Sequence, residues 1–221
     1  MTIGVDIDNV LNSLCESVLE VYNSDSGDNV QFNEILNYGI EQYIKPAWRT
    51  KFWEYFGDER VWDRIVWRVD WVVKLIEAGE HDIYFVTATH PEYAGNKFNQ
   101  LLKALISVST KSNKEMKDYL KSHFVLLENK HLFKADIIID DYIENLHLEK
   151  EDVYNILVSK PWNIKWANRY NATYLERQRI IICDDTGDIP KIIEAIRNNK
   201  KSCELKTKRK ELWTRKWGNI T

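Results

Sequence analysis

The sequence has few of the residues that build cysteine-based sites or membrane spans. Its three cysteines, Cys15, Cys183 and Cys203, are far apart and form no Cys-x-x-Cys pair. This number and spacing exclude a zinc site built from cysteines and fit a reducing compartment. No apolar run is long enough to span a membrane, and no basic segment followed by an apolar one opens the chain. We therefore expect a cytoplasmic protein that has no membrane partner.

Charge and length are those of an ordinary globular protein. The formal net charge of −3 argues against a protein coated in nucleic acid. A hydrophobic content of 44% and a charged content of 29% are typical of soluble domains. The 221 residues are enough for one sizeable core and a smaller appended lobe.

Short apolar segments alternate with helical patterns along most of the chain. The segments that read as strands begin at residue 3 and continue at 82–86, 124–127, 136–139, 153–158 and 179–183. The helical patterns cover 13–22, 62–76, 93–106, 112–123 and 189–197. This alternation predicts an α/β fold with a Rossmann-like, three-layer α/β/α arrangement around a parallel sheet.

The aromatic segment from Val30 to Trp62 interrupts this alternation and predicts a small helical cap inserted after the first strand. We expect a core domain of residues 1–14 and 63–198, a cap of residues 15–62, and a basic tail of residues 199–221. The tail has eight Lys or Arg and two Glu between Lys200 and Lys216. We favour a solvated terminal helix for it, and an arm that attracts phosphate groups is the alternative.

Polar side chains stand at the ends of three predicted strands. Asp6 and Asp8 follow the first, Thr87 follows the second, and the pair Asp140–Asp141 follows a later one. The carboxyl ends of parallel strands converge on one crevice of a doubly wound sheet. A carboxylate cluster without cysteine or paired histidine favours a hard cation, so Mg²⁺ is the expected cofactor. Thr87 and Lys130 would add donors for a phosphoryl group.

Simpler explanations exist for several of these residues. Asp-x-Asp is common in turns, and a threonine at a strand end often bonds to the backbone. Lys134 competes with Lys130, but it immediately precedes a strand and would lie at the wrong end of the sheet. The pair Asp184–Asp185 is explained by a turn and a helix N-cap.

Four short segments, in this order, carry a resemblance to known enzymes: Val5-Asp6-Ile7-Asp8-Asn9-Val10, Val86-Thr87-Ala88-Thr89, Asn129-Lys130 and Asp136-Ile137-Ile138-Ile139-Asp140-Asp141. Together they resemble the haloacid dehalogenase superfamily, and their spacing is similar to that of its 5'(3')-deoxyribonucleotidase family. The resemblance covers about residues 3–195, and the cap after the first segment matches it. Asn9 stands where glycine is common, and Ala88 interrupts the usual polar pair.

The resemblance implies a role for each matching residue. Asp6 would be the nucleophile, and Asp8 would be the general acid and then the general base. Mg²⁺ would be held by Asp6, by the backbone carbonyl of Asp8 and by one of Asp140 and Asp141. Lys130 and Thr87 would contact the transferring phosphoryl group.

Residues expected to bind the rest of the substrate are less sharply defined. Ala88 and Thr89 follow the threonine of the second segment. A nucleotidase would also need an aromatic ring that stacks on the base, and Phe52 or Trp53 in the cap is the candidate.

We therefore expect a Mg²⁺-dependent phosphomonoesterase, a 5'(3')-deoxyribonucleotidase acting on a nucleoside monophosphate. Four alternatives stay open. The substrate could be another small phosphate ester or a nucleic-acid 3' end. The phosphoryl group could pass to an acceptor other than water, or the fold could be a binding module without turnover. The sequence leaves the number of subunits open, with a homodimer among the options.

Overall fold

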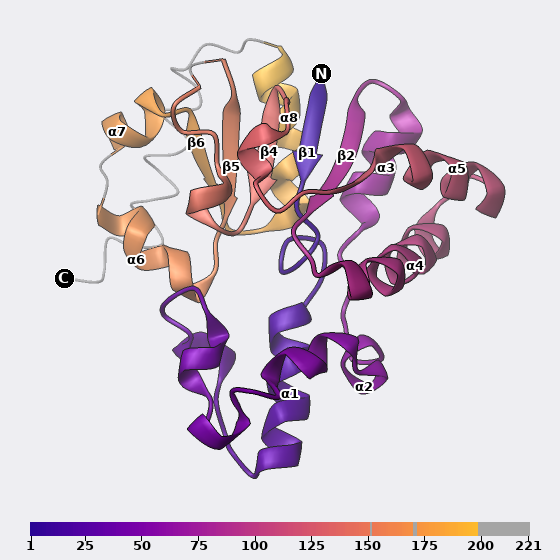
Figure 1. The fold of residues 1–221 in the computed structure, drawn as a ribbon. Helices are drawn as coiled ribbons and strands as arrows, with labels where there is room; N and C mark the ends of the chain where they lie inside the picture. The colour runs from indigo at the N-terminus through magenta and orange to yellow at the C-terminus, as the bar shows by residue number, and fades with distance from the viewer. Residues whose placement is uncertain (151, 170–171, 199–221) are drawn as a thin grey trace. The chain divides into compact units, whose positions relative to one another are not determined.

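The computed structural model describes residues 1–150, 152–169 and 172–198 (Figure 1). The fold has two compact units, the first being Met1–Thr186 and the second beginning at Gly187. The site described below lies within the first unit. The basic tail, 199–221, lies outside the described residues, so both alternatives for it stay predictions.

Six parallel strands form one sheet with the order β3-β2-β1-β4-β5-β6. The strands are β1 (Thr2–Val5), β2 (Asp82–Thr87), β3 (Phe124–Leu126), β4 (Ile137–Asp140), β5 (Tyr154–Val158) and β6 (Ile180–Cys183). Central β1 has Val5 in register with Phe85 of β2 and with Ile139 of β4. The chain runs outward from β1 to β3 and then returns to β4 on the other side. The carboxyl ends of β1 and β4 therefore border a switch point, where ligand crevices form in such sheets.

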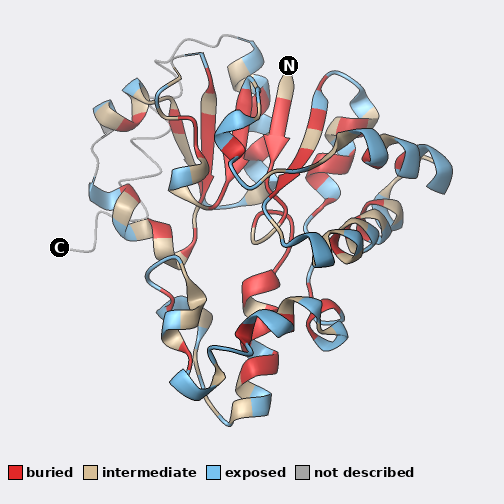
Figure 2. Ribbon diagram, in the orientation of Figure 1, coloured by how far each residue is buried: buried red, intermediate tan, exposed pale blue. Residues whose placement is uncertain are grey.

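The predicted α/β fold with a parallel sheet is confirmed. Its α-helices are α1 (Leu14–Ser26), α2 (Glu59–Trp62), α3 (Asp70–Ala78), α4 (Pro91–Val108), α5 (Asn113–His123), α6 (Pro161–Arg169), α7 (Ala172–Arg177) and α8 (Ile189–Arg197). Strand β4 is buried at every position. Much of the sheet is red in Figure 2, which shows that buried residues are concentrated in the strands. Burial on both faces explains why the strands are continuous apolar runs rather than alternating ones.

Two of the predicted helix boundaries have clear local causes. Helix α3 ends at Gly79, whose φ of 66° is in the left-handed region that glycine adopts without strain. Helix α5 begins with a capping box, in which Glu115 N donates to Ser112 Oγ (3.3 Å) and Ser112 N donates to Glu115 Oε2 (2.9 Å).

The helix predicted over 62–76 is wrong in its first half. Residues 63–69 instead run back toward the start of α1, where Trp67 forms an antiparallel bridge with Asn12. Ser13 N donates to Val66 O (3.1 Å) and Arg68 N donates to Leu11 O (2.8 Å). These partners lie far away in the sequence and satisfy the backbone without a helix. The apolar spacing is misleading here, since the side chain of Val66 is 59% exposed.

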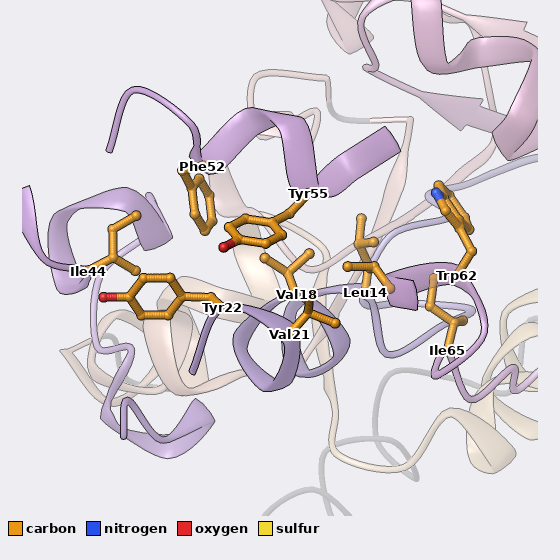
Figure 3. Close-up of a cluster of buried hydrophobic side chains, with 10 residues drawn as sticks. Leu14, Val18, Val21, Tyr22, Ile44, Phe52, Tyr55, Trp62 and Ile65 are labelled. Carbon is orange, nitrogen blue, oxygen red and sulfur yellow. The ribbon is translucent and has the colours of Figure 1, made fainter. Parts of the chain in front are cut away.

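The segment between α1 and α2 packs against both helices in one hydrophobic cluster (Figure 3). It contains four 3-10 helices, η1 (Phe32–Glu34), η2 (Ile40–Tyr43), η3 (Pro46–Trp48) and η4 (Phe52–Gly57), rather than α-helices. The buried members of the cluster are Leu14, Val18, Val21, Tyr22, Ile44, Phe52, Tyr55, Val61, Trp62 and Ile65. The division of the first unit into core and cap stays a prediction.

Candidate active site

The loop after β1 carries the first two acidic residues. Asp6 N donates to Ile139 O (2.9 Å), which extends the pairing of β1 with β4 and fixes Asp6 at the carboxyl end of the sheet. The chain then turns, with Leu11 N donating to Ile7 O (2.9 Å) and with Asn9 at a φ of 59°. Asparagine tolerates this left-handed conformation better than most residues, so the turn does not require glycine at this position.

Lys130 connects the ends of β1 and β4. It lies in the short helix η5 (Lys130–Leu132), and its side chain is 5% exposed. Its Nζ is 2.7 Å from Asp6 Oδ1 and 2.8 Å from Asp140 Oδ2. Lys134, the competing candidate, is exposed. The structure thus brings Lys130 to the carboxylates.

The two acids after β4 have different surroundings. Asp140 Oδ1 accepts hydrogen bonds from Tyr142 N (2.9 Å) and Asn145 Nδ2 (3.1 Å), and Oδ2 faces Lys130. Asp141 is 2% exposed, yet among the described residues no group donates to its buried Oδ2. Single oxygens of Asp6, Asp140 and Asp141 lie within 4.8 Å of one another.

Thr87 and Asp8 meet at a second lysine that the sequence analysis did not single out. Thr87 ends β2 and is fully buried. Lys97, on α4, donates from Nζ to Thr87 Oγ1 (3.1 Å) and forms an ion pair with Asp8 Oδ2. A sequence signal for Lys97 does exist, because it shares the buried stripe of α4 with Leu101 and Leu105, at helical spacing. A lysine at an apolar-stripe position requires a buried partner.

Comparison with known proteins now decides the family. A family model described as "5' nucleotidase, deoxy (Pyrimidine), cytosolic type C protein" matches residues 1–184 of the chain. The chain belongs to this 5'-nucleotidase family. Membership makes it a phosphoric monoester hydrolase of the 5'-nucleotidase type, as the resemblance predicted.

The chain is also similar to one curated relative in sequence and to one solved structure in fold. The nucleotidase is 26% identical over 146 residues to a 5'(3')-deoxyribonucleotidase from Clostridium acetobutylicum, a match that covers 66% of this chain and 75% of the relative. A haloacid dehalogenase-like family hydrolase from Streptococcus pneumoniae has the same fold, with a TM-score of 0.50 at 9% identity. That match covers 87% of this chain and 97% of the solved one. No helix among the described residues of the nucleotidase has the length and apolar character of a membrane span.

Two buried carboxyl groups in the site of the nucleotidase have raised pKa values. Burial raises the pKa of Asp6 to about 7, and the charges of Asp140 and Asp8 add to the effect, although Lys130 opposes it. Burial also raises the pKa of Asp141, and repulsion by Asp140 and Asp6 adds to it. Burial alone would lower the pKa of Lys130, but the two carboxylates beside it outweigh burial and raise that pKa. Lys130 therefore reduces the rise in the pKa of Asp6 but does not cancel it.

The residues present fit a hard divalent cation. Three buried carboxylates converge, and Asp141 Oδ2 is a buried acceptor for which no described residue supplies a donor. Carboxylate oxygens are the donors that Mg²⁺ prefers. The side chain of Asp8 is not part of this group, because its carboxylate faces Lys97.

The predicted base-stacking residues differ in what they offer. Phe52 is fully buried in the cluster of Figure 3 and presents no exposed face to a base, so its role in binding the substrate stays a prediction. Trp53 is 56% exposed and packs on Phe52 and Phe56. Ala88 is exposed and Thr89 partly so, in the loop that leads from β2 to α4. The roles of Trp53, Ala88 and Thr89 stay predictions.

A different aromatic group lies next to the acidic pair. The ring of Tyr38 stacks on Tyr142, with centroids 3.7 Å apart and an interplanar angle of 16°. Tyr142 immediately follows Asp141, and Trp162 meets Tyr38 edge-on at 6.2 Å. Tyr38 remains 53% exposed, so a flat ligand can reach it. Sequence reasoning missed this group because its members are far apart in the chain.

Proposed function

We propose that this nucleotidase hydrolyses nucleoside monophosphates in a Mg²⁺-dependent reaction through a phosphorylated Asp6. The observation that carries the proposal is the buried Asp6–Lys130–Asp140 group at the carboxyl ends of β1 and β4. A carboxylate held there by an ammonium group is a nucleophile that is already oriented.

In the first step, an oxygen of Asp6 attacks phosphorus and the bond to the nucleoside oxygen breaks. The proton on Asp8 moves to that leaving oxygen, which departs as an alcohol. In the second step a water molecule attacks phosphorus, gives a proton to Asp8 and releases inorganic phosphate, and Asp6 is regenerated. Lys130 offsets the negative charge that develops as the phosphoryl group approaches Asp6.

Asp6, Asp141 and the backbone carbonyl of Asp8 would hold the Mg²⁺ ion. Asp141 is preferred over Asp140, because both oxygens of Asp140 already have hydrogen-bond or ion-pair partners. The bound ion supplies positive charge that offsets repulsion between the carboxylates and the phosphate.

Tyr38 is the proposed platform for the base. Stacking on an aromatic ring stabilises a bound base by about 1–3 kcal/mol and does not require a particular base. Residues 15–62 would then act as a cap that carries Tyr38 to the substrate. The name of the relative from Clostridium acetobutylicum supports a nucleotide rather than a sugar phosphate.

Phosphate release from a panel of ribo- and deoxyribonucleoside 5'- and 3'-monophosphates and sugar phosphates tests the proposal. Each substrate is assayed with Mg²⁺, with EDTA and with the Asp6→Asn variant. We expect turnover of nucleotides only, which EDTA and Asp6→Asn both abolish. Turnover of sugar phosphates alone would contradict the nucleotide assignment, and release by Asp6→Asn would contradict the role of Asp6.

A further inference from the structure

Lys97 is a buried ammonium group whose contacts are both with the site. Lys97 is 2% exposed. Its Nζ donates to Thr87 Oγ1 (3.1 Å) and forms an ion pair with Asp8 Oδ2. The two contacts come from the ends of different strands, since Asp8 follows β1 and Thr87 ends β2. Lys97 thus connects the ends of β1 and β2 through Asp8 and Thr87, as Lys130 connects those of β1 and β4 through Asp6 and Asp140.

Packing alone does not explain a lysine at this position. The neighbouring buried positions of α4 are Leu101, Ala104 and Leu105, and an apolar residue would continue that stripe. A buried ammonium loses its hydration, and replacing a buried ion pair by apolar residues is often neutral or stabilising. The position is therefore better explained by what Lys97 does to its two partners.

The contact with Asp8 distinguishes its two oxygens. Lys97 pairs with Oδ2, and within the described part of the chain Oδ1 accepts one long hydrogen bond, from Asn12 Nδ2 (3.4 Å). Oδ1 is consequently the oxygen left to carry the proton that the leaving group needs. An ammonium on Oδ2 also stops the carboxylate from rotating, which keeps Oδ1 in one direction.

The contact with Thr87 fixes the direction of its hydroxyl hydrogen. An ammonium group has donors and no acceptor, so Thr87 Oγ1 must accept from Lys97. The hydroxyl hydrogen then points away from Lys97 and is available to donate to a phosphoryl oxygen. One lysine therefore orients a proton donor and a hydrogen-bond donor at once.

We propose that Lys97 is a positioning residue, which orients Asp8 for proton transfer to the leaving oxygen and Thr87 toward the phosphoryl group. The inference rests on the proposed function. It predicts that the loss of Lys97 is felt most by substrates whose leaving group must be protonated. A nucleoside leaves as a poor alkoxide and needs the proton, whereas p-nitrophenolate is stable without one.

The test compares kcat/KM for a nucleoside 5'-monophosphate and for p-nitrophenyl phosphate, because kcat/KM reports the steps up to departure of the leaving group. The variants are Lys97→Met, Lys97→Arg and the control Lys103→Met, an exposed lysine of the same helix. We expect Lys97→Met to lower kcat/KM for the nucleotide by about 100-fold or more, the range of a lost general acid. The loss for p-nitrophenyl phosphate should be less than about tenfold by the same reasoning, and Lys103→Met should match the wild type.

Lys97→Arg keeps the charge but cannot reproduce the compact geometry of an ammonium group. It should show the same leaving-group dependence in weaker form, and it remains informative if Lys97→Met does not fold. Equal losses on both substrates in folded variants, or no loss on either, would overturn the inference alone. A wild-type chain that cleaves neither ester would overturn the proposed function, and this inference with it.

Discussion

Lys130 and Asp6 form a buried ion pair, with 2.7 Å between Nζ and Oδ1. The pair lies at the switch point between β1 and β4, where the strand order reverses. Asp140 shares the same ammonium group at 2.8 Å. One cation is thus divided between two carboxylates, while Asp141 nearby has a raised pKa of its own. The arrangement holds Asp6, the proposed nucleophile, in place, and three carboxylates converge there that could hold a metal ion.

Replacing Lys130 should lower the free energy of unfolding and also inactivate the protein. Lys130→Met leaves Asp6 and Asp140 buried without their cation, and breaking such a pair costs about 3–5 kcal/mol of unfolding free energy. Urea denaturation measures this. The matched control Lys134→Met removes an exposed lysine and should change stability by less than about 0.5 kcal/mol. Equal stability of the two variants would contradict the buried ion-pair network.

The two acids after β4 should respond oppositely to truncation. Asp140→Ala removes the acceptor for Tyr142 N, Asn145 Nδ2 and Lys130, so it should lower the melting temperature. Asp141→Ala removes a buried carboxylate oxygen without a donor among the described residues, so the metal-free protein should melt at the same or a higher temperature. Mg²⁺ should bind Asp141→Ala more than about tenfold more weakly, since even partners of ligands contribute that much. Metal titration followed by differential scanning fluorimetry checks both, and the reverse pattern would assign the metal to Asp140.

Stabilisation by Mg²⁺ should grow with pH. Burial raises the pKa of Asp6 to about 7, above its value of 3.8 in the unfolded chain. Asp6 therefore favours the metal-free fold most at low pH, and that contribution is lost as pH rises through about 7. A metal ligand must be deprotonated, so the gain in melting temperature on adding Mg²⁺ should be small at pH 5 and larger at pH 8.

The control for that pH dependence is Asp6→Asn, which cannot titrate at this position. Its gain in melting temperature with Mg²⁺ should vary less between the two pH values than that of the wild type. A gain that is equal at both pH values in the wild type would show that Asp6 and Asp141 are not protonated in the metal-free fold.

Tyr38 should matter for nucleotides and not for substrates without a ring. Tyr38→Ala removes the exposed partner of the stacked pair, and the loss of about 1–3 kcal/mol of stacking corresponds to a KM higher by about 5- to 150-fold. Steady-state kinetics on a nucleotide and on a simple alkyl phosphate measures the difference. Trp53→Ala is the control, an exposed cap tryptophan that packs on Phe52 and Phe56. A larger effect of Trp53→Ala would restore the sequence-based assignment.

Much of the site was predictable because parallel strands bring their ends together. Asp6, Thr87 and Asp140 each end an apolar run, and the structure brings them and Lys130 to one edge of the sheet. Runs of this kind are local in sequence, and their meeting point follows from topology.

The remaining features depend on contacts between distant segments. Residues 63–69 pair with residues 11–13, so their helical spacing is overridden by backbone partners. Tyr38 and Tyr142 stack across more than a hundred positions of sequence, which no local pattern encodes. Helix α6 was not predicted, because its buried positions are Asn163 and Ala167, a polar and a small residue that do not mark an apolar stripe. Lys97 did have a sequence signal, because it is a lysine on the apolar stripe of α4, but it belongs to none of the four matching segments.

The most direct test of the central claim is to look for the phosphoryl group on Asp6. Asp8→Asn is mixed with ³²P-labelled p-nitrophenyl phosphate and Mg²⁺ and quenched in acid; this ester releases its leaving group without an acid, and the missing base slows the following hydrolysis. The account predicts a burst of p-nitrophenol, an equal amount of label on the protein that hydroxylamine removes, and neither in the Asp6→Asn, Asp8→Asn double variant. A burst without labelled protein, or label that survives Asp6→Asn, would contradict it.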